Sequence, residues 1–102
     1  MPKKLFIMVL SLLVSNCSIN HESDIHNWKK NHISLEQLEK AMKYCGYNDR
    51  YELSDKSPDE IAETHMCMVK HGYDYIDIDG HYCKKNPSLT SCLKAKKQGI
   101  IN

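Results

Sequence analysis

The segment from His65 to His71 (His-Met-Cys-Met-Val-Lys-His) contains the densest group of side chains that could bind a soft metal. Cys67 and His71 are four residues apart, so on a helix they would share one face. With Met68 they offer a thiolate, an imidazole and a thioether, which suit a metal such as Cu(I). The alternative interpretation is that Cys67 is oxidised in a disulfide and Met68 belongs to the core. In an oxidising compartment we expect the disulfide and no metal. Soft-metal binding through Cys67, Met68 and His71 is kept as an alternative function.

A second group, Asp77, Asp79 and Gly80, matches part of a calcium-binding loop. The EF-hand spacing fails, because Tyr75 stands where the first Asp belongs and Asn86 where the closing Glu belongs. The expected structure here is therefore a solvated turn.

The sequence offers no constellation for catalysis. It has no Gly-x-Ser-x-Gly segment and no pair of carboxylates in an apolar context, and its cysteines can all be assigned to other roles. At 102 residues it is too short for a dinucleotide-binding domain or a TIM barrel. A formal charge of +1 lacks the basic excess of a nucleic-acid-binding protein. We therefore expect no enzymatic activity, no catalytic residues, no cofactor and no nucleic-acid partner.

The first residues have the pattern of an export signal. Residues 1–4 carry two lysines, and residues 5–14 are apolar apart from one serine. Ten residues make a helix about 15 Å long, roughly half the hydrocarbon thickness of a bilayer. The pattern therefore predicts a signal peptide over residues 1–16 rather than a permanent membrane span.

The residues that follow, Val14-Ser15-Asn16-Cys17, resemble the bacterial lipoprotein box, in which a short run of small or apolar residues ends at an acylated cysteine. Asn16 departs from the usual Gly or Ala. The resemblance implies that Cys17 carries acyl chains, palmitate among them, and becomes the mature N-terminus. Ser18, in place of an Asp, favours the outer membrane by the sorting rule of such lipoproteins. The alternative is an ordinary signal peptide cut nearby.

Once Cys17 is assigned to the lipid, an even set of cysteines remains: Cys45, Cys67, Cys83 and Cys92. An even number in an exported chain indicates disulfides. Four cysteines allow three pairings. We prefer Cys45–Cys67, which would join two helices, with Cys83–Cys92 closing a smaller loop, and the other two pairings stay open.

The mature chain divides into a tether and one domain. Residues 17–27 comprise the lipidated cysteine and a polar tether. Residues 28–102 form the domain, beginning at Trp28, the first large apolar residue after the tether. Its apolar residues are few, so two disulfides would supply much of its stability. The predicted fold is a small, mainly α, disulfide-stapled domain of two to three short helices.

The first helix is predicted from residue 35 to residue 45. Ser34 and Gln37 have the spacing of a capping box. Gly46 follows as a left-handed cap, and Tyr47 is positioned to fold back on Met42.

The second helix repeats this scheme. Ser57 and Glu60 have capping-box spacing, and Pro58 occupies the first turn. Gly72 ends the helix, and Tyr73 again follows the glycine.

The remaining segments are shorter. Residues 76–79 alternate as in an extended piece, which would turn at Asp79-Gly80. Asn86-Pro87 has the cap-plus-proline form of a third helix, which would end at Gly99.

These features together resemble the small, largely uncharacterised lipoproteins of Gram-negative gammaproteobacteria and their prophages. The features that carry the likeness are Trp28, the helix end Met42–Tyr47, the segment Cys67–Tyr73, and Cys83…Pro87…Cys92. The resemblance implies a lipid-anchored envelope protein without enzymatic activity, and no catalytic residues carry over.

The expected function is therefore a structural or protein-binding role in the cell envelope. The partners would be the membrane, through the acyl chains, and a protein. Tyrosine is enriched at protein interfaces, so any exposed tyrosine is a candidate contact. The six are Tyr44, Tyr47, Tyr51, Tyr73, Tyr75 and Tyr82.

Overall fold

The computed structural model describes residues 23–102. The predicted signal peptide (1–16), the predicted lipidation site Cys17 and residues 18–22 of the predicted tether lie outside the described residues. None of the helices formed by residues 23–102 is long and apolar enough to span a bilayer.

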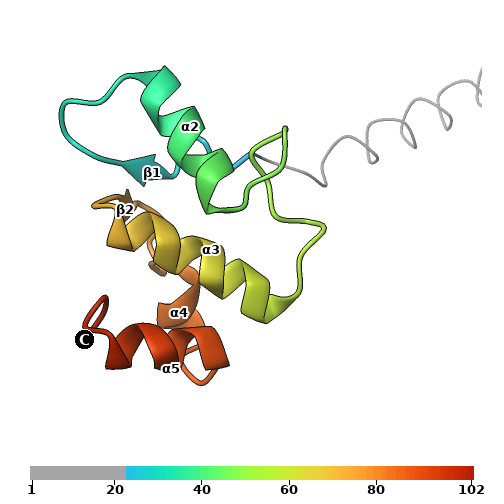
Figure 1. The fold of residues 1–102 in the computed structure, drawn as a ribbon, viewed down its shortest axis with the longest axis vertical. Helices are drawn as coiled ribbons and strands as arrows, with labels where there is room; N and C mark the ends of the chain where they lie inside the picture. Colours follow the sequence, from blue (N-terminus) through green and yellow to red (C-terminus); the bar gives the residue numbers. More distant parts are fainter. Residues whose placement is uncertain (1–22) are drawn as a thin grey trace, which may run out of the picture.

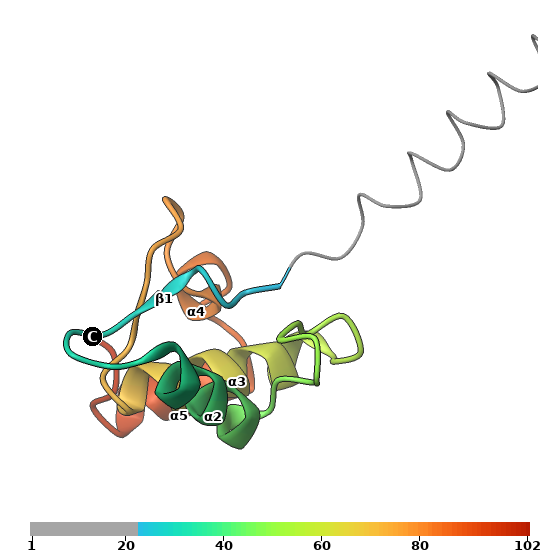
Figure 2. The ribbon, with the colours of Figure 1, turned by 90° about the horizontal axis from the view of Figure 1, so that it is seen from above.

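Three helices form one layer, with α3 (Pro58–Lys70) in the middle. On either side of it lie α2 (Leu35–Cys45) and α5 (Thr90–Lys97) (Figure 1). A short strand pair, β1 (Trp28–Lys29) and β2 (Asp74–Tyr75), and the four-residue helix α4 (Tyr82–Lys85) lie over one face of this layer (Figure 2). The strands are antiparallel, with Trp28 opposite Tyr75. The fold is mainly α, as predicted.

Both long helices begin at the predicted capping boxes. The Ser34 hydroxyl accepts a hydrogen bond from the Gln37 backbone N–H, and the Gln37 side chain accepts one from the Ser34 N–H. Ser57 and Glu60 make the same reciprocal pair, with Pro58 as the first helical residue. The donors that a helix start leaves unpaired are thus satisfied locally, and the predicted starts are confirmed.

Both helices also end as the glycines predict. Gly46 takes a left-handed conformation (φ 119°), which lets the next N–H, that of Tyr47, donate to the Met42 carbonyl at 3.0 Å. After α3, the Tyr73 N–H donates to the Met68 carbonyl at 3.1 Å. These bonds turn both tyrosines back into the domain, where each is 5% exposed.

Helix α3 contributes to two separate cores. The first core lies between α3, α2 and the strands and comprises Trp28, Leu38, Met42, Cys45, Tyr47, Met68 and Tyr73. The second lies between α3, α4 and α5 and comprises Ala62, Met66, Cys83, Cys92 and Ala95. The preferred cysteine pairing is confirmed, with disulfides Cys45–Cys67 and Cys83–Cys92. Each core is thus linked by one disulfide. Both cores and both disulfides lie within residues 23–102, so this part of the chain carries its own apolar cores and covalent links.

The last helix begins later than predicted, at Thr90 rather than at the Asn86-Pro87 pair. Leu89 precedes it and makes no side-chain cap. Instead Asp59 of α3 accepts hydrogen bonds from the Ser91 backbone N–H (2.8 Å) and hydroxyl (2.9 Å). The start of α5 is therefore set by a carboxylate 32 residues earlier in the chain, which no local pattern reveals.

Two other local features differ from the predictions. The extended piece lies at Asp74–Tyr75, because its partner is β1, whereas Ile76 and Ile78 are exposed. Helix α4 was not predicted at all. Its cap is His81, whose Nδ1 accepts from the Lys84 N–H at 3.3 Å, and histidine is not among the preferred capping residues.

We expect removal of either disulfide to destabilise the domain. Cys45–Cys67 joins residues 22 apart, so the double substitution Cys45→Ala/Cys67→Ala should cost about 3 kcal/mol of unfolding free energy by loop-closure entropy. Cys83→Ala/Cys92→Ala, across a separation of 9, should cost about 2.5 kcal/mol. Urea unfolding measures both.

The control is Ser88→Ala, an exposed residue inside the smaller loop, which should leave the unfolding midpoint unchanged. Double variants as stable as the parent chain would contradict the stabilising role of the disulfides.

Candidate functional site

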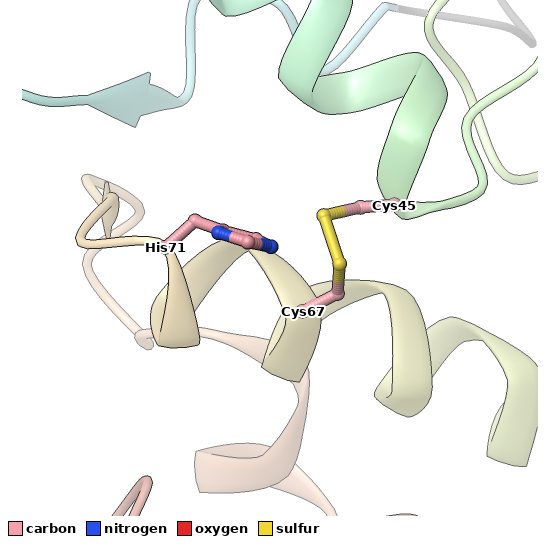
Figure 3. Close-up of side chains that lie close together, drawn as sticks. All are labelled: Cys45, Cys67 and His71. Carbon is pink, nitrogen blue, oxygen red and sulfur yellow. A yellow bond between two sulfur atoms is a disulfide. The ribbon is translucent and has the colours of Figure 1, made fainter.

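Within residues 23–102, one group of three His, Cys, Asp or Glu side chains brings its ligand atoms together: Cys45, Cys67 and His71. These atoms all lie within 4.8 Å of one another. Cys45 is the last residue of α2, Cys67 lies on α3, and His71 caps the end of α3 one turn further on (Figure 3). The two sulfurs form the disulfide, and the imidazole lies beside it.

A cysteine binds a metal as a thiolate, so the two sulfurs cannot act as thiolate ligands while they form the disulfide. Reduction by two electrons and two protons would yield two thiols beside the imidazole. Two sulfurs and one nitrogen are three of the four ligands of a tetrahedral Cys₂His-type site. The structure thus brings together two of the three predicted ligands, Cys67 and His71, and adds Cys45. Met68 is fully buried in the first core.

The surface around this group is hollowed on two sides. Tyr44 is 77% exposed, and its ring packs edge-on to His71 with 5.5 Å between ring centroids. Tyr44 and His71 both line a hollow of about 280 Å³ toward α5 and another of about 490 Å³ that Lys40 also lines. Lys70 also lines the smaller hollow. We call the surface formed by these four residues, Tyr44, His71, Lys40 and Lys70, the Tyr44 face.

A second constellation, not predicted from the sequence, is a buried polar network around Asp24. Its carboxylate accepts hydrogen bonds from the Tyr47 hydroxyl (2.7 Å), the Asn27 amide (2.9 Å) and the Tyr75 hydroxyl (3.1 Å). The Tyr47 hydroxyl in turn accepts from the Trp28 indole N–H at 2.8 Å. The network therefore ties residues 24–28 to the end of α2 and to β2. Asp24 belongs to the segment predicted as tether, four residues before Trp28, the predicted start of the domain.

His65 of α3 completes this network. It is 4% exposed, its Nδ1 accepts from the Tyr82 backbone N–H at 2.9 Å, and its Nε2 lies 3.8 Å from Asp24 Oδ2. With Nδ1 acting as an acceptor, the proton of the neutral ring belongs on Nε2, toward the carboxylate. Among the described residues no buried side-chain polar atom lacks a partner. The Asp24–His65 pair is thus held by partners within the fold.

The network shifts the pKa values of its acidic groups. Burial by itself would raise the pKa of Asp24, but the surrounding donors, His65 and Tyr47 foremost, outweigh it and lower the pKa from 3.8 to about 2. Burial, reinforced by the negative charge of Asp24, raises the pKa of Tyr47 and of Tyr75. Asp24 is therefore ionised, and both phenols are neutral donors, at any ordinary pH.

The calcium-like segment is a turn. The Gly80 N–H donates to the Asp77 carbonyl at 2.9 Å, and Gly80 has a positive φ of 79°. The Asp77 carboxylate pairs with Lys85 at 3.3 Å. The Asp77 carboxylate thus faces a lysine instead of other acidic ligands, in agreement with the predicted solvated turn.

No protein-family model, curated protein or solved structure matches this chain.

Asp24 makes the stability of the domain depend on pH. A carboxyl whose pKa falls from 3.8 to about 2 on folding stabilises the fold above pH ~4, and this contribution is lost as the pH drops from about 4 toward 2. After allowance for partial solvent exposure, the contribution is about 1–2 kcal/mol. Asp24→Asn should therefore lose about this much stability at neutral pH and flatten the profile below pH ~4.

Urea unfolding at a series of pH values measures this. Asp55→Asn, at an exposed carboxylate, is the matched control and should keep the parent slope. If the unfolding free energy of Asp24→Asn depended on pH as steeply as that of the parent chain, the network would not lower the pKa of Asp24.

Proposed function

We propose that this chain is a lipid-anchored protein of the cell envelope, at the outer membrane, and that it binds another protein rather than catalysing a reaction. Two observations support the compartment. Disulfides form and persist in oxidising environments, and this domain has two. They use Cys45, Cys67, Cys83 and Cys92 and leave Cys17, in its lipoprotein-box pattern, for acylation.

The binding role is supported above all by the exposure of Tyr44. Of the six tyrosines, Tyr47 and Tyr73 are buried, and Tyr44 is the most exposed aromatic residue described. Its ring is oriented by His71 and stands between two hollows. A rigid, amphipathic ring at a hollowed face is the kind of group that anchors protein interfaces. The polar network around Asp24, by contrast, is internal and saturated.

The binding role can be tested by photo-crosslinking in living cells. A photo-reactive amino acid at position 44 should give a discrete adduct with one partner. The matched control is position 36 on the same helix, about 12 Å away, where the Glu36 side chain is equally exposed (77%). Tyr44→Ala should abolish co-purification of that partner without lowering the unfolding midpoint.

Absence of an adduct at position 44, or the same adducts at positions 36 and 44, would rule out the Tyr44 face as the contact.

The anchor is tested by Cys17→Ser. The parent chain should incorporate labelled palmitate and fractionate with membranes, and its intact mass should report the acyl chains and two disulfides. The variant should lose the label and appear in the soluble fraction, since the acyl chains are its proposed hold on the bilayer. Ser18→Ala, which keeps the cysteine, is the control. A Cys17→Ser chain that still carries the label would contradict the assignment.

A second function, binding of a soft metal, is favoured by the convergence of Cys45, Cys67 and His71. It requires the thiol form, so thiol titration of native protein comes first, and two reactive thiols per chain would support it. After reduction by a phosphine under nitrogen, the chain should bind one Cu(I). His71→Ala should weaken that binding about tenfold or more, whereas His32→Ala, at an exposed position, should not.

No reactive thiols in native protein would reject this function, and so would equal Cu(I) uptake before and after reduction.

A further inference from the structure

The charges of the domain are segregated along the chain. Residues 80–102 contain five lysines and no Asp or Glu, whereas residues 23–79 contain seven Lys and Arg against twelve Asp and Glu. The formal side-chain charges are therefore +5 and −5. The basic part coincides with a structural unit, helices α4 and α5 joined by the Cys83–Cys92 disulfide. A surface of one sign raises the local concentration of oppositely charged ligands.

A pocket of about 680 Å³ opens in this basic unit. It is the largest of the hollows described, and its size lies in the range typical of small-molecule sites. Its apolar lining includes Pro87, Leu93 and Ile101, and Leu93 is 55% exposed. Lys84 and Lys96 are the basic groups of the lining, and no Asp or Glu is part of it.

The two lysines are available to a ligand. Lys84 and Lys96 are exposed, and neither forms an ion pair with another residue in 23–102, whereas the neighbouring Lys85 pairs with Asp77. Burial, with smaller contributions from the nearby His65 and from the positive charge of Lys84, lowers the pKa of His81 at the pocket. The positive charge of the pocket at neutral pH thus comes from lysine.

An apolar lining beside two unpaired ammonium groups fits an anionic amphiphile. Inorganic phosphate would use the lysines but leave Leu93 and Ile101 in water. An acidic peptide would likewise gain from the charge and leave the apolar lining unfilled. We propose that the pocket between α4 and α5 binds one anionic phospholipid, its phosphate at Lys84 and Lys96 and the start of an acyl chain against Leu93 and Ile101.

This site does not depend on Cys17, so it can be tested on residues 23–102 with both disulfides intact. The probe is co-sedimentation with vesicles of phosphatidylcholine, alone or mixed with phosphatidylglycerol. The domain should bind the mixed vesicles and not the neutral ones. Lys84→Gln/Lys96→Gln should weaken binding about 25-fold, since each lysine near an anionic surface contributes about fivefold. Lys29→Gln/Lys43→Gln, which removes the same charge from other exposed positions, should change it much less.

Leu93→Asn distinguishes the pocket from diffuse attraction between charges. It keeps every lysine, yet it should weaken binding severalfold, and short-chain phosphatidylglycerol below its micelle concentration should compete where inorganic phosphate does not. Unchanged binding by Leu93→Asn, equal losses in the two lysine pairs, or tighter binding of an oligoglutamate peptide than of the lipid would each overturn the proposal. Thermal unfolding of every variant confirms that it is folded.

Discussion

The whole domain depends on one helix that must serve two cores at once. Met68 of α3 lies in the first core, and Ala62 and Met66 lie in the second. Each core contains few large side chains, and burial of so little apolar surface leaves only a small net stability. The covalent links complement this arrangement. Cys45–Cys67 fastens α2 to the central helix, whereas Cys83–Cys92 closes the α4–α5 unit that packs on its other side.

Those parts of the fold that local chemistry decides could be predicted from the sequence. The serine caps at residues 34 and 57 and the glycine ends at 46 and 72 involve groups a few residues apart, and both long helices follow from them. The start of α5 could not be predicted, because its cap is the distant Asp59. The strand pair β1–β2 depends likewise on distant residues: Trp28 and Tyr75 are 47 positions apart, and Lys29 and Asp74 are 45 apart.

The same distinction applies to the candidate sites. Cys67 and His71 could be paired from their spacing on one helix, but Cys45 joins them only through the packing of α2 on α3. The Asp24 network gave no sequence signal, since its members come from four separate segments and resemble ordinary polar residues. The basic character of residues 80–102 was visible in the sequence. The pocket beside these lysines could be found only from the folded structure.

The position of Asp24 has a mechanical consequence. Tension applied to the N-terminal end of the described chain reaches this residue before it reaches β1. Through its bonds to Tyr47 and Tyr75 and its approach to His65, the load spreads at once to α2, β2 and α3. Force from the N-terminal end is therefore transmitted to the middle of the domain, and the strands β1 and β2 do not have to separate first.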